Sequence, residues 1–91
     1  MSKDLMYINS AILDCRLRGV IYNVYHKRIS VARRVLFKTL KSLQDIDTDC
    51  NIDEYIYVFA VERISTALDF MSTENFQNAV QDLRKIRALF E

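Results

Sequence analysis

The chain contains no proline and only one glycine, Gly19, among its 91 residues. Sheet-rich folds need many tight turns, and these draw on Gly, Pro and Asn-Gly pairs for their backbone angles. A chain nearly free of these residues has few tight turns, which favours long helices. A single glycine also excludes a glycine-rich loop that cradles phosphate groups.

Histidine and cysteine are scarce as well, with one His26 and two cysteines, Cys15 and Cys50. No pair of them has zinc-ligand spacing. On one continuous helix Cys15 and His26 would lie roughly 16 Å apart, too far for a nucleophile–base pair. We therefore assign no catalytic, cofactor-binding or metal-binding residue and expect no enzyme. We expect reduced thiols in or near the core, with a Cys15–Cys50 disulfide as the less favoured alternative.

An acidic segment, residues 47–53, is similar to the opening of a calcium-binding loop. An EF-hand needs glycine at position six and glutamate at position twelve, whereas counting from Asp47 these positions hold Ile52 and Val58. The acidic residues more plausibly cap a helix and keep a loop soluble.

Long apolar runs are absent. The charge-free stretches Leu5–Leu13 and Tyr55–Val61 are far shorter than the roughly 20 residues of a membrane helix. The first residues show no basic leader followed by an apolar run. The hydrophobic fraction of 51% is enough for a packed core, and 91 residues are too few for two domains. We therefore expect a single helical domain over residues 1–91 that is cytoplasmic and has no membrane span.

Four segments have helical periodicity, which predicts an all-α protein, a compact bundle of three or four helices. The first three segments begin near Lys3, Ser30 and Asp53, and the last begins after Ser72 or Thr73. Ser72 or Thr73 is expected to cap the last helix, and Asn51 with Glu54 forms a capping-box-like pair before the third. The apolar positions that define the four stripes are Leu5, Ile8, Ile12 and Cys15; Ala32, Leu36, Leu40 and Leu43; Tyr57, Val61, Ile64, Leu68 and Met71; and Phe76, Ala79, Leu83, Ile86 and Phe90.

Two runs, Val20–Tyr25 and Tyr55–Val61, are rich in β-branched and aromatic residues. Paired as strands near 20–25 and 55–61, they would make the protein α+β. We favour helix for both, because the second run lies within a helical stripe and the first has no turn residues after it. Gly19 is then expected to mark a kink or a break in a long first helix.

Charge is distributed very unevenly along the chain. Residues 1–45 carry nine basic and three acidic side chains, a net charge of +6, and residues 46–91 carry four basic and nine acidic ones, a net charge of −5. Between Cys15 and Gln44 there is no acidic residue and there are eight basic ones. The near-neutral total therefore conceals a dipolar molecule.

A basic stripe is predicted on the second helix, where Arg34, Lys38 and Lys41 follow at i, i+4 and i+7, and Lys27 extends the stripe if the helix begins early enough. The stripe is either a solvated face partly neutralised by the acidic half, or a surface for an acidic protein, a nucleic acid or an anionic membrane. Among partners we favour an acidic protein. Tyr22 and Tyr25 could stack on bases but more often pack against a core.

Residues 62–91 resemble one tetratricopeptide-type helical hairpin. Ala67, Phe70, Phe76, Ala79 and Leu83 match its alternation of small, aromatic and large positions. The chain departs from the repeat at Arg63, Ile86 and Glu91. The resemblance implies a groove for a peptide or helix, as in small adaptors and in the tetratricopeptide-like chaperones of bacterial secretion systems.

These observations predict a small helical adaptor, chaperone or regulator that acts by protein–protein contact. The hydrophobic content exceeds what so small a bundle needs, so the partner is expected to be a second copy, giving a homodimer, or an acidic protein. The alternative is a small nucleic-acid-binding regulator that uses the basic second helix.

Overall fold

The computed structural model describes residues 7–90 and contains four helices and two short strands over that range. In chain order they are β1 (Tyr7–Asn9), α1 (Ser10–Tyr25), α2 (Ile29–Gln44), β2 (Asp49–Asn51), α3 (Glu54–Ser72) and α4 (Phe76–Ala88). The predicted all-α bundle is confirmed. Both runs that could have been strands, 20–25 and 55–61, are helical, so the α+β alternative was wrong.

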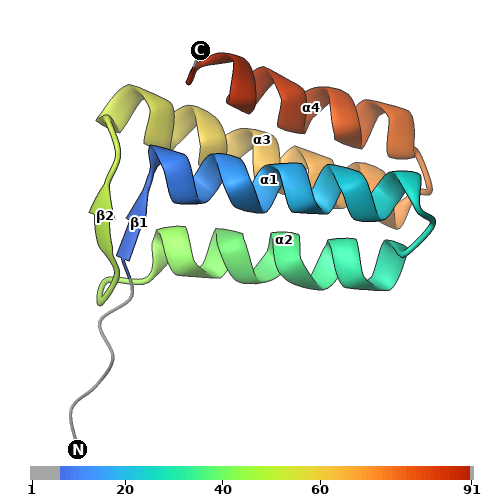
Figure 1. Ribbon diagram of the computed structural model, residues 1–91, viewed down its shortest axis with the longest axis horizontal. Coiled ribbons are helices and arrows are strands. Elements are labelled where there is room, and N and C mark those ends of the chain that lie inside the picture. The colour runs from blue at the N-terminus through green and yellow to red at the C-terminus, as the bar shows by residue number, and fades with distance from the viewer. Residues whose placement is uncertain (1–6, 91) are drawn as a thin grey trace, which may run out of the picture.

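The four helices form a ring in which consecutive helices run in opposite directions (Figure 1). α1 packs against α2 and α4, and α3 packs against the same two helices. Their apolar stripes meet in one core, in which Leu17, Leu36, Ile64 and Leu83 are fully buried. Each helix buries one stripe and leaves the opposite face outside, as an amphipathic helix in a bundle does.

The first helix begins later than its sequence pattern indicated. Asn9 caps α1, because its side-chain oxygen accepts a hydrogen bond from the Ile12 amide at 2.8 Å. The predicted stripe of Ile8, Ile12 and Cys15 was therefore wrong: Ile8 lies in β1 and Cys15 is exposed, while Leu5 lies outside the described residues. The stripe that faces the core follows the same spacing from a later start, and consists of Leu13, Leu17, Val20 and Val24.

Gly19 neither kinks nor ends this helix. It lies within α1, and its carbonyl oxygen accepts a hydrogen bond from the Asn23 side chain at 2.9 Å. Two expected caps are also absent. Thr73 ends α3 and α4 begins only after Asn75, while Asn51 belongs to β2 and Asp53, without a side-chain cap bond, precedes α3.

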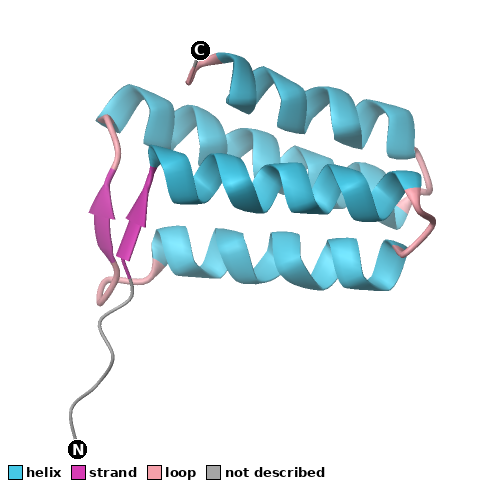
Figure 2. Ribbon diagram, viewed as in Figure 1, coloured by secondary structure: helices cyan, strands magenta, loops and turns pink. Residues whose placement is uncertain are grey.

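The two strands lie side by side at one end of the bundle (Figure 2) and pair in parallel, with Ile8 opposite Cys50. Ile8 is fully buried, which anchors the strand pair to the core. The Asn51 side chain donates a hydrogen bond to the Tyr7 hydroxyl at 3.2 Å. Each strand precedes the first helix of a helical hairpin, so the chain is built from two strand–helix–helix units.

The two hairpins are structural repeats, related by an offset of 47 residues that carries Ile29, the start of α2, onto Phe76, the start of α4. Fully or nearly fully buried residues occupy equivalent positions in both. These pairs are Leu13 and Ala60, Leu17 and Ile64, Val20 and Ala67, Val24 and Met71, Ala32 and Ala79, Leu36 and Leu83, and Thr39 and Ile86. Under this offset the contact of α1 with α4 corresponds to that of α3 with α2, so the ring has approximate twofold symmetry.

The turns of the two hairpins have the same backbone conformation. Lys27 has φ 63° and Glu74 has φ 60°, both in the left-handed region. The following amides, those of Arg28 and Asn75, each donate a 2.8 Å hydrogen bond to a carbonyl five residues earlier. This is the Schellman arrangement that closes many helices, in which the left-handed position is usually glycine.

Candidate interaction surface on helix α2

The outer face of α2 carries a cluster of exposed basic side chains. Ala32, Leu36 and Leu43 face the core, and the opposite side of α2 is exposed. The structure brings Arg34, Lys38 and Lys41 together there, as the sequence predicted. We call these three residues, with the exposed Arg33 and Phe37, the basic face.

Lys27 is not part of this face, which corrects the sequence prediction. α2 begins only at Ile29, so Lys27 lies in the turn after α1 instead of on an extension of the stripe. It lines a separate groove at the turn end of the bundle, together with Tyr25 and Arg84. The Arg84 guanidinium donates a 2.7 Å hydrogen bond to the Tyr25 hydroxyl there, so this tyrosine is engaged within the chain.

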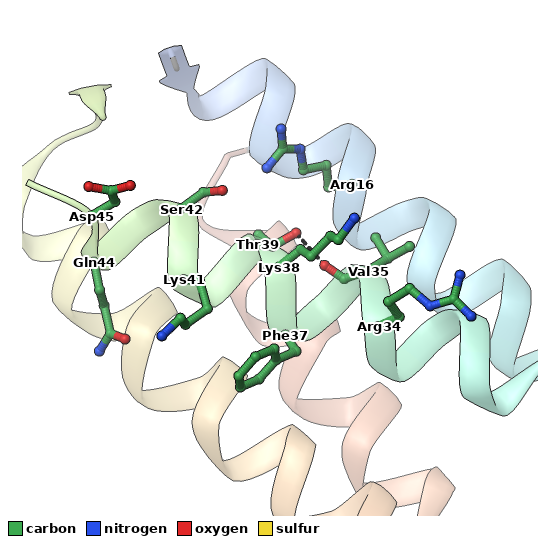
Figure 3. Close-up of a pocket in the computed structure, with 10 residues that line it drawn as sticks. All are labelled: Arg16, Arg34, Val35, Phe37, Lys38, Thr39, Lys41, Ser42, Gln44 and Asp45. Carbon is green, nitrogen blue, oxygen red and sulfur yellow. Dashed lines mark hydrogen bonds between the residues drawn. The ribbon is translucent and has the colours of Figure 1, made fainter. Parts of the chain in front are cut away.

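A groove of about 910 Å³ runs along the basic face, and Figure 3 shows the side chains that line it. Its apolar lining includes the half-buried Val35 and the ring of Phe37, which is 52% exposed. One cation comes from the neighbouring helix: Arg16 of α1 lines the same groove and was missed by the sequence interpretation. The full lining consists of Arg16, Arg34, Val35, Phe37, Lys38, Thr39, Lys41, Ser42, Gln44 and Asp45.

The cations of the groove have no acidic partner among residues 7–90. The ion pairs found there join Arg63 to Asp82 and Arg87 to Asp14, and none involves Arg16, Arg34, Lys38 or Lys41. The sequence left open that the acidic half of the chain neutralises this stripe; within the described residues it forms no ion pair with it.

Phe37 is placed to contact a ligand on either side of α2. It lines the groove described above and a second one of about 670 Å³ between α2 and α3. The Lys41 ammonium lies 5.9 Å from the centre of its ring, close enough for a cation–π contact. Aromatic residues, phenylalanine included, and arginine are enriched at the cores of protein–protein interfaces.

The remaining candidate groups do not form a second site. Among residues 7–90 no group of three or more His, Cys, Asp or Glu side chains is arranged to hold a metal ion. Cys15 and Cys50 are both free thiols. Burial raises the pKa of the Cys50 thiol, an effect that a backbone hydrogen bond at Ile52 partly opposes.

Comparisons with known protein families, curated proteins and solved structures find no significant match for this chain. Within the described residues, no helix has both the length and the apolar character needed to cross a membrane.

Proposed function

We propose that this protein is a small helical adaptor, chaperone or regulator that binds an acidic protein partner through the basic face of α2. The observation that carries the proposal is the groove: four cations, Arg16, Arg34, Lys38 and Lys41, line it without an intramolecular ion pair to a described carboxylate. Unpaired surface cations attract a partner of opposite charge and orient it during encounter.

The apolar floor of the groove favours a protein over a nucleic acid. Val35 and Phe37 offer apolar surface to a partner side chain, whereas a phosphate backbone makes mainly polar and ionic contacts. The nucleic-acid alternative rests on the spacing of Arg34, Lys38 and Lys41 alone.

Charge reversal on the basic face tests this function against a matched control. The triple reversal R34E/K38E/K41E changes the net charge from +1 to −5. The control reversal R18E/K27E/K85E makes the same change at exposed positions away from the groove, and Glu74 already occupies the turn position equivalent to Lys27. Both variants are expected to retain the helical circular dichroism of the wild type, because all six side chains are exposed.

The measurement is affinity purification of the tagged chain from its native host with mass spectrometry, followed by reconstitution with the captured protein. We expect the triple reversal to lose the partner and the control reversal to retain it. Phe37→Ala should weaken reconstituted binding by more than about 1 kcal/mol, because it removes an exposed aromatic ring from the centre of the contact. Equal binding by both reversals would contradict the proposal.

Two further measurements separate the other possible partners. Analytical ultracentrifugation at low and high salt reports self-association, and a dimer that only the triple reversal dissociates would identify a second copy as the partner. Titration of labelled DNA and RNA at two salt concentrations reports nucleic-acid binding. Tight, steeply salt-dependent binding that only the triple reversal abolishes would replace the proposed function by the alternative one.

A further inference from the structure

The two hairpins differ at one pair of positions that lies inside the candidate groove. The offset of 47 residues carries Arg16 onto Arg63, so the first helix of each hairpin has an arginine at the same place. It carries Val35 onto Asp82, so the second helix of each hairpin differs there. An arginine therefore faces an acid in one repeat and an aliphatic side chain in the other.

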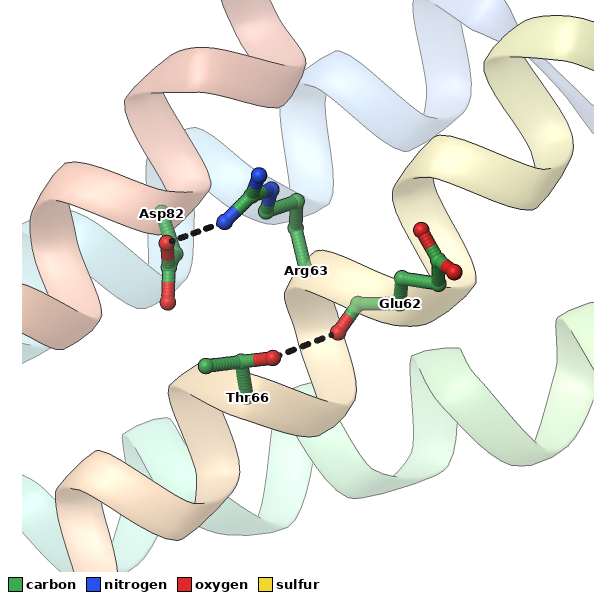
Figure 4. Close-up of polar contacts among 4 residues, drawn as sticks. All are labelled: Glu62, Arg63, Thr66 and Asp82. Carbon is green, nitrogen blue, oxygen red and sulfur yellow. Dashed lines mark hydrogen bonds and ion pairs between the residues drawn. The ribbon is translucent and has the colours of Figure 1, made fainter.

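In the second hairpin this arginine is paired within the chain. The Arg63 guanidinium donates a hydrogen bond to the Asp82 carboxylate at 3.4 Å (Figure 4). The Asp82 side chain is only 5% exposed, and the guanidinium lies 5.2 Å from the centre of the Phe59 ring. We call this position, at the contact between the two helices, the seat; Oδ1 of Asp82 is bound there, whereas its buried Oδ2 has no hydrogen-bond partner among the described residues.

In the first hairpin the arginine is present and the carboxylate is not. Arg16 lines the groove beside Val35 and forms no ion pair with a described residue. Arg34 and Lys38 extend from α2 into the same groove (Figure 3). Three cations next to one another repel each other, and a carboxylate among them would relieve that repulsion.

We propose that the groove between α1 and α2 receives an aspartate or glutamate side chain of the partner, which pairs with Arg16 from outside the chain, because Val35 occupies the position equivalent to Asp82. The occupant is an acidic amphipathic helix: its carboxylates pair with Arg16, Arg34 and Lys38, and its apolar side chains pack on Val35 and Phe37. This inference rests on the proposed function and names the chemistry of the partner. A carboxylate is favoured over a phosphate because the equivalent seat in the same chain already holds a carboxylate.

An acidic side chain of the chain itself should pair with Arg16 and so prevent a carboxylate of the partner from binding there. Val35→Asp places an acid where Asp82 stands in the second hairpin, so Arg16 acquires an internal partner. Val35→Asn is the control for the lost apolar contact, and Val31→Asp adds the same charge at an exposed position on α2 outside the groove. Arg16→Gln removes the cation without altering α2, with Arg18→Gln as its exposed counterpart on α1.

The probe is a fluorescein-labelled peptide of about 18 residues, long enough to form a helix, with glutamates on one face and leucines on the other. Fluorescence anisotropy at low ionic strength measures its Kd for each full-length variant. We expect Arg16→Gln to raise the Kd about fivefold, the factor that corresponds to about 1 kcal/mol at 25 °C. Val35→Asp should raise the Kd about fivefold above that of Val35→Asn, which removes the same apolar contact, while Val31→Asp and Arg18→Gln should change it less than about twofold.

Several results would overturn the inference. The inference fails if the wild type shows no measurable binding of the peptide. It also fails if Arg16→Gln and Arg18→Gln change the Kd equally, or if Val35→Asp binds the peptide as well as Val35→Asn does. If the triple reversal still abolished partner binding, the proposed function would survive the loss of this inference. A DNA oligonucleotide that bound more tightly than the peptide, with the same sensitivity to Arg16→Gln, would show that the seat takes phosphate and would likewise overturn it.

Discussion

The two hairpin turns offer a direct test of the repeat, because each places a non-glycine residue in the left-handed region. A left-handed conformation costs an L-residue roughly 1–2 kcal/mol, whereas glycine adopts it without steric penalty. Glycine also gains roughly 0.5–1 kcal/mol more conformational entropy on unfolding, which offsets part of the benefit. Lys27→Gly and Glu74→Gly should therefore each stabilise the protein by about 0.5–1 kcal/mol, and by similar amounts because the two turns have the same geometry.

The assay is thermal and urea unfolding followed by circular dichroism. For a domain of this size the expected gain raises Tm by about 2–8 °C. Lys85→Gly is the matched control: Lys85 is exposed within α4, so glycine there should destabilise the protein by about 1 kcal/mol. Lys27→Gly should leave peptide binding unchanged, because Lys27 lies outside the groove. A loss of stability in both turn variants would refute the left-handed turns and, with them, the equivalence of the hairpins.

Three further predictions concern the core, the thiols and the groove. Leu83→Ala should lower the free energy of unfolding by about 2–5 kcal/mol in urea denaturation, because Leu83 is fully buried. Leu68→Ala should lower it by less, because Leu68 is half-buried. Equal small losses in both variants would show that the core is misplaced. The exposed Cys15 should react with a thiol reagent near neutral pH, while Cys50 should react more slowly and only at higher pH, because its raised pKa keeps the thiol protonated; mass spectrometry of the labelled sites checks the order. Burial favours the neutral thiol of Cys50, so its contribution to stability should be fully present below the unfolded-state pKa and be lost as pH rises through the raised folded-state pKa. Urea unfolding of the wild type and of Cys50→Ala at several pH values would detect this loss.

Helical periodicity predicted most of the fold because apolar spacing survives small errors in helix ends. The stripes of α2, α3 and α4 were largely placed correctly, and Ala32, Leu36, Ile64 and Leu83 are buried as expected. The first helix was misplaced because Leu5, Ile8 and Ile12 continue the periodic pattern past the true start of α1. The Asn9 cap fixes the N-terminal start of α1. Ile8, just before the cap, is buried in a parallel strand whose partner strand is more than 40 residues away in the sequence.

The turns escaped prediction for a related reason. Low glycine content correctly indicated long helices, but it also suggested that sharp reversals would be few. The chain instead closes both hairpins with Lys27 and Glu74 in a conformation that usually belongs to glycine. A sequence pattern does not reveal such positions, because nothing in the residue type of lysine or glutamate signals a positive φ.

The repeat itself could not be found from the sequence, since the two hairpins share very few residues. Over the aligned positions from Ser10 to Gln44, identical residues occur at Arg16, Ala32, Leu36 and Lys38. The buried positions coincide in place and not in identity, as with Leu13 and Ala60, because a core constrains apolar volume more than it constrains residue type. Arg16 was overlooked for the same reason, because only the repeat shows that its equivalent, Arg63, pairs with the acidic side chain of Asp82.

The same reasoning indicates where binding specificity resides in this molecule. Both hairpins keep buried residues at equivalent positions, whereas the charge of their outer faces differs. There the first hairpin has Arg34 and Lys41 where the second has uncharged Gln81 and Ala88. The two hairpins thus present different surfaces. Arg16, Arg34, Lys38 and Lys41 line a groove of the first hairpin beside Val35 and Phe37, and none of these cations forms an ion pair with a described residue. A partner that reads charge and shape together can therefore distinguish α2 from α4, although the core gives both helices the same support.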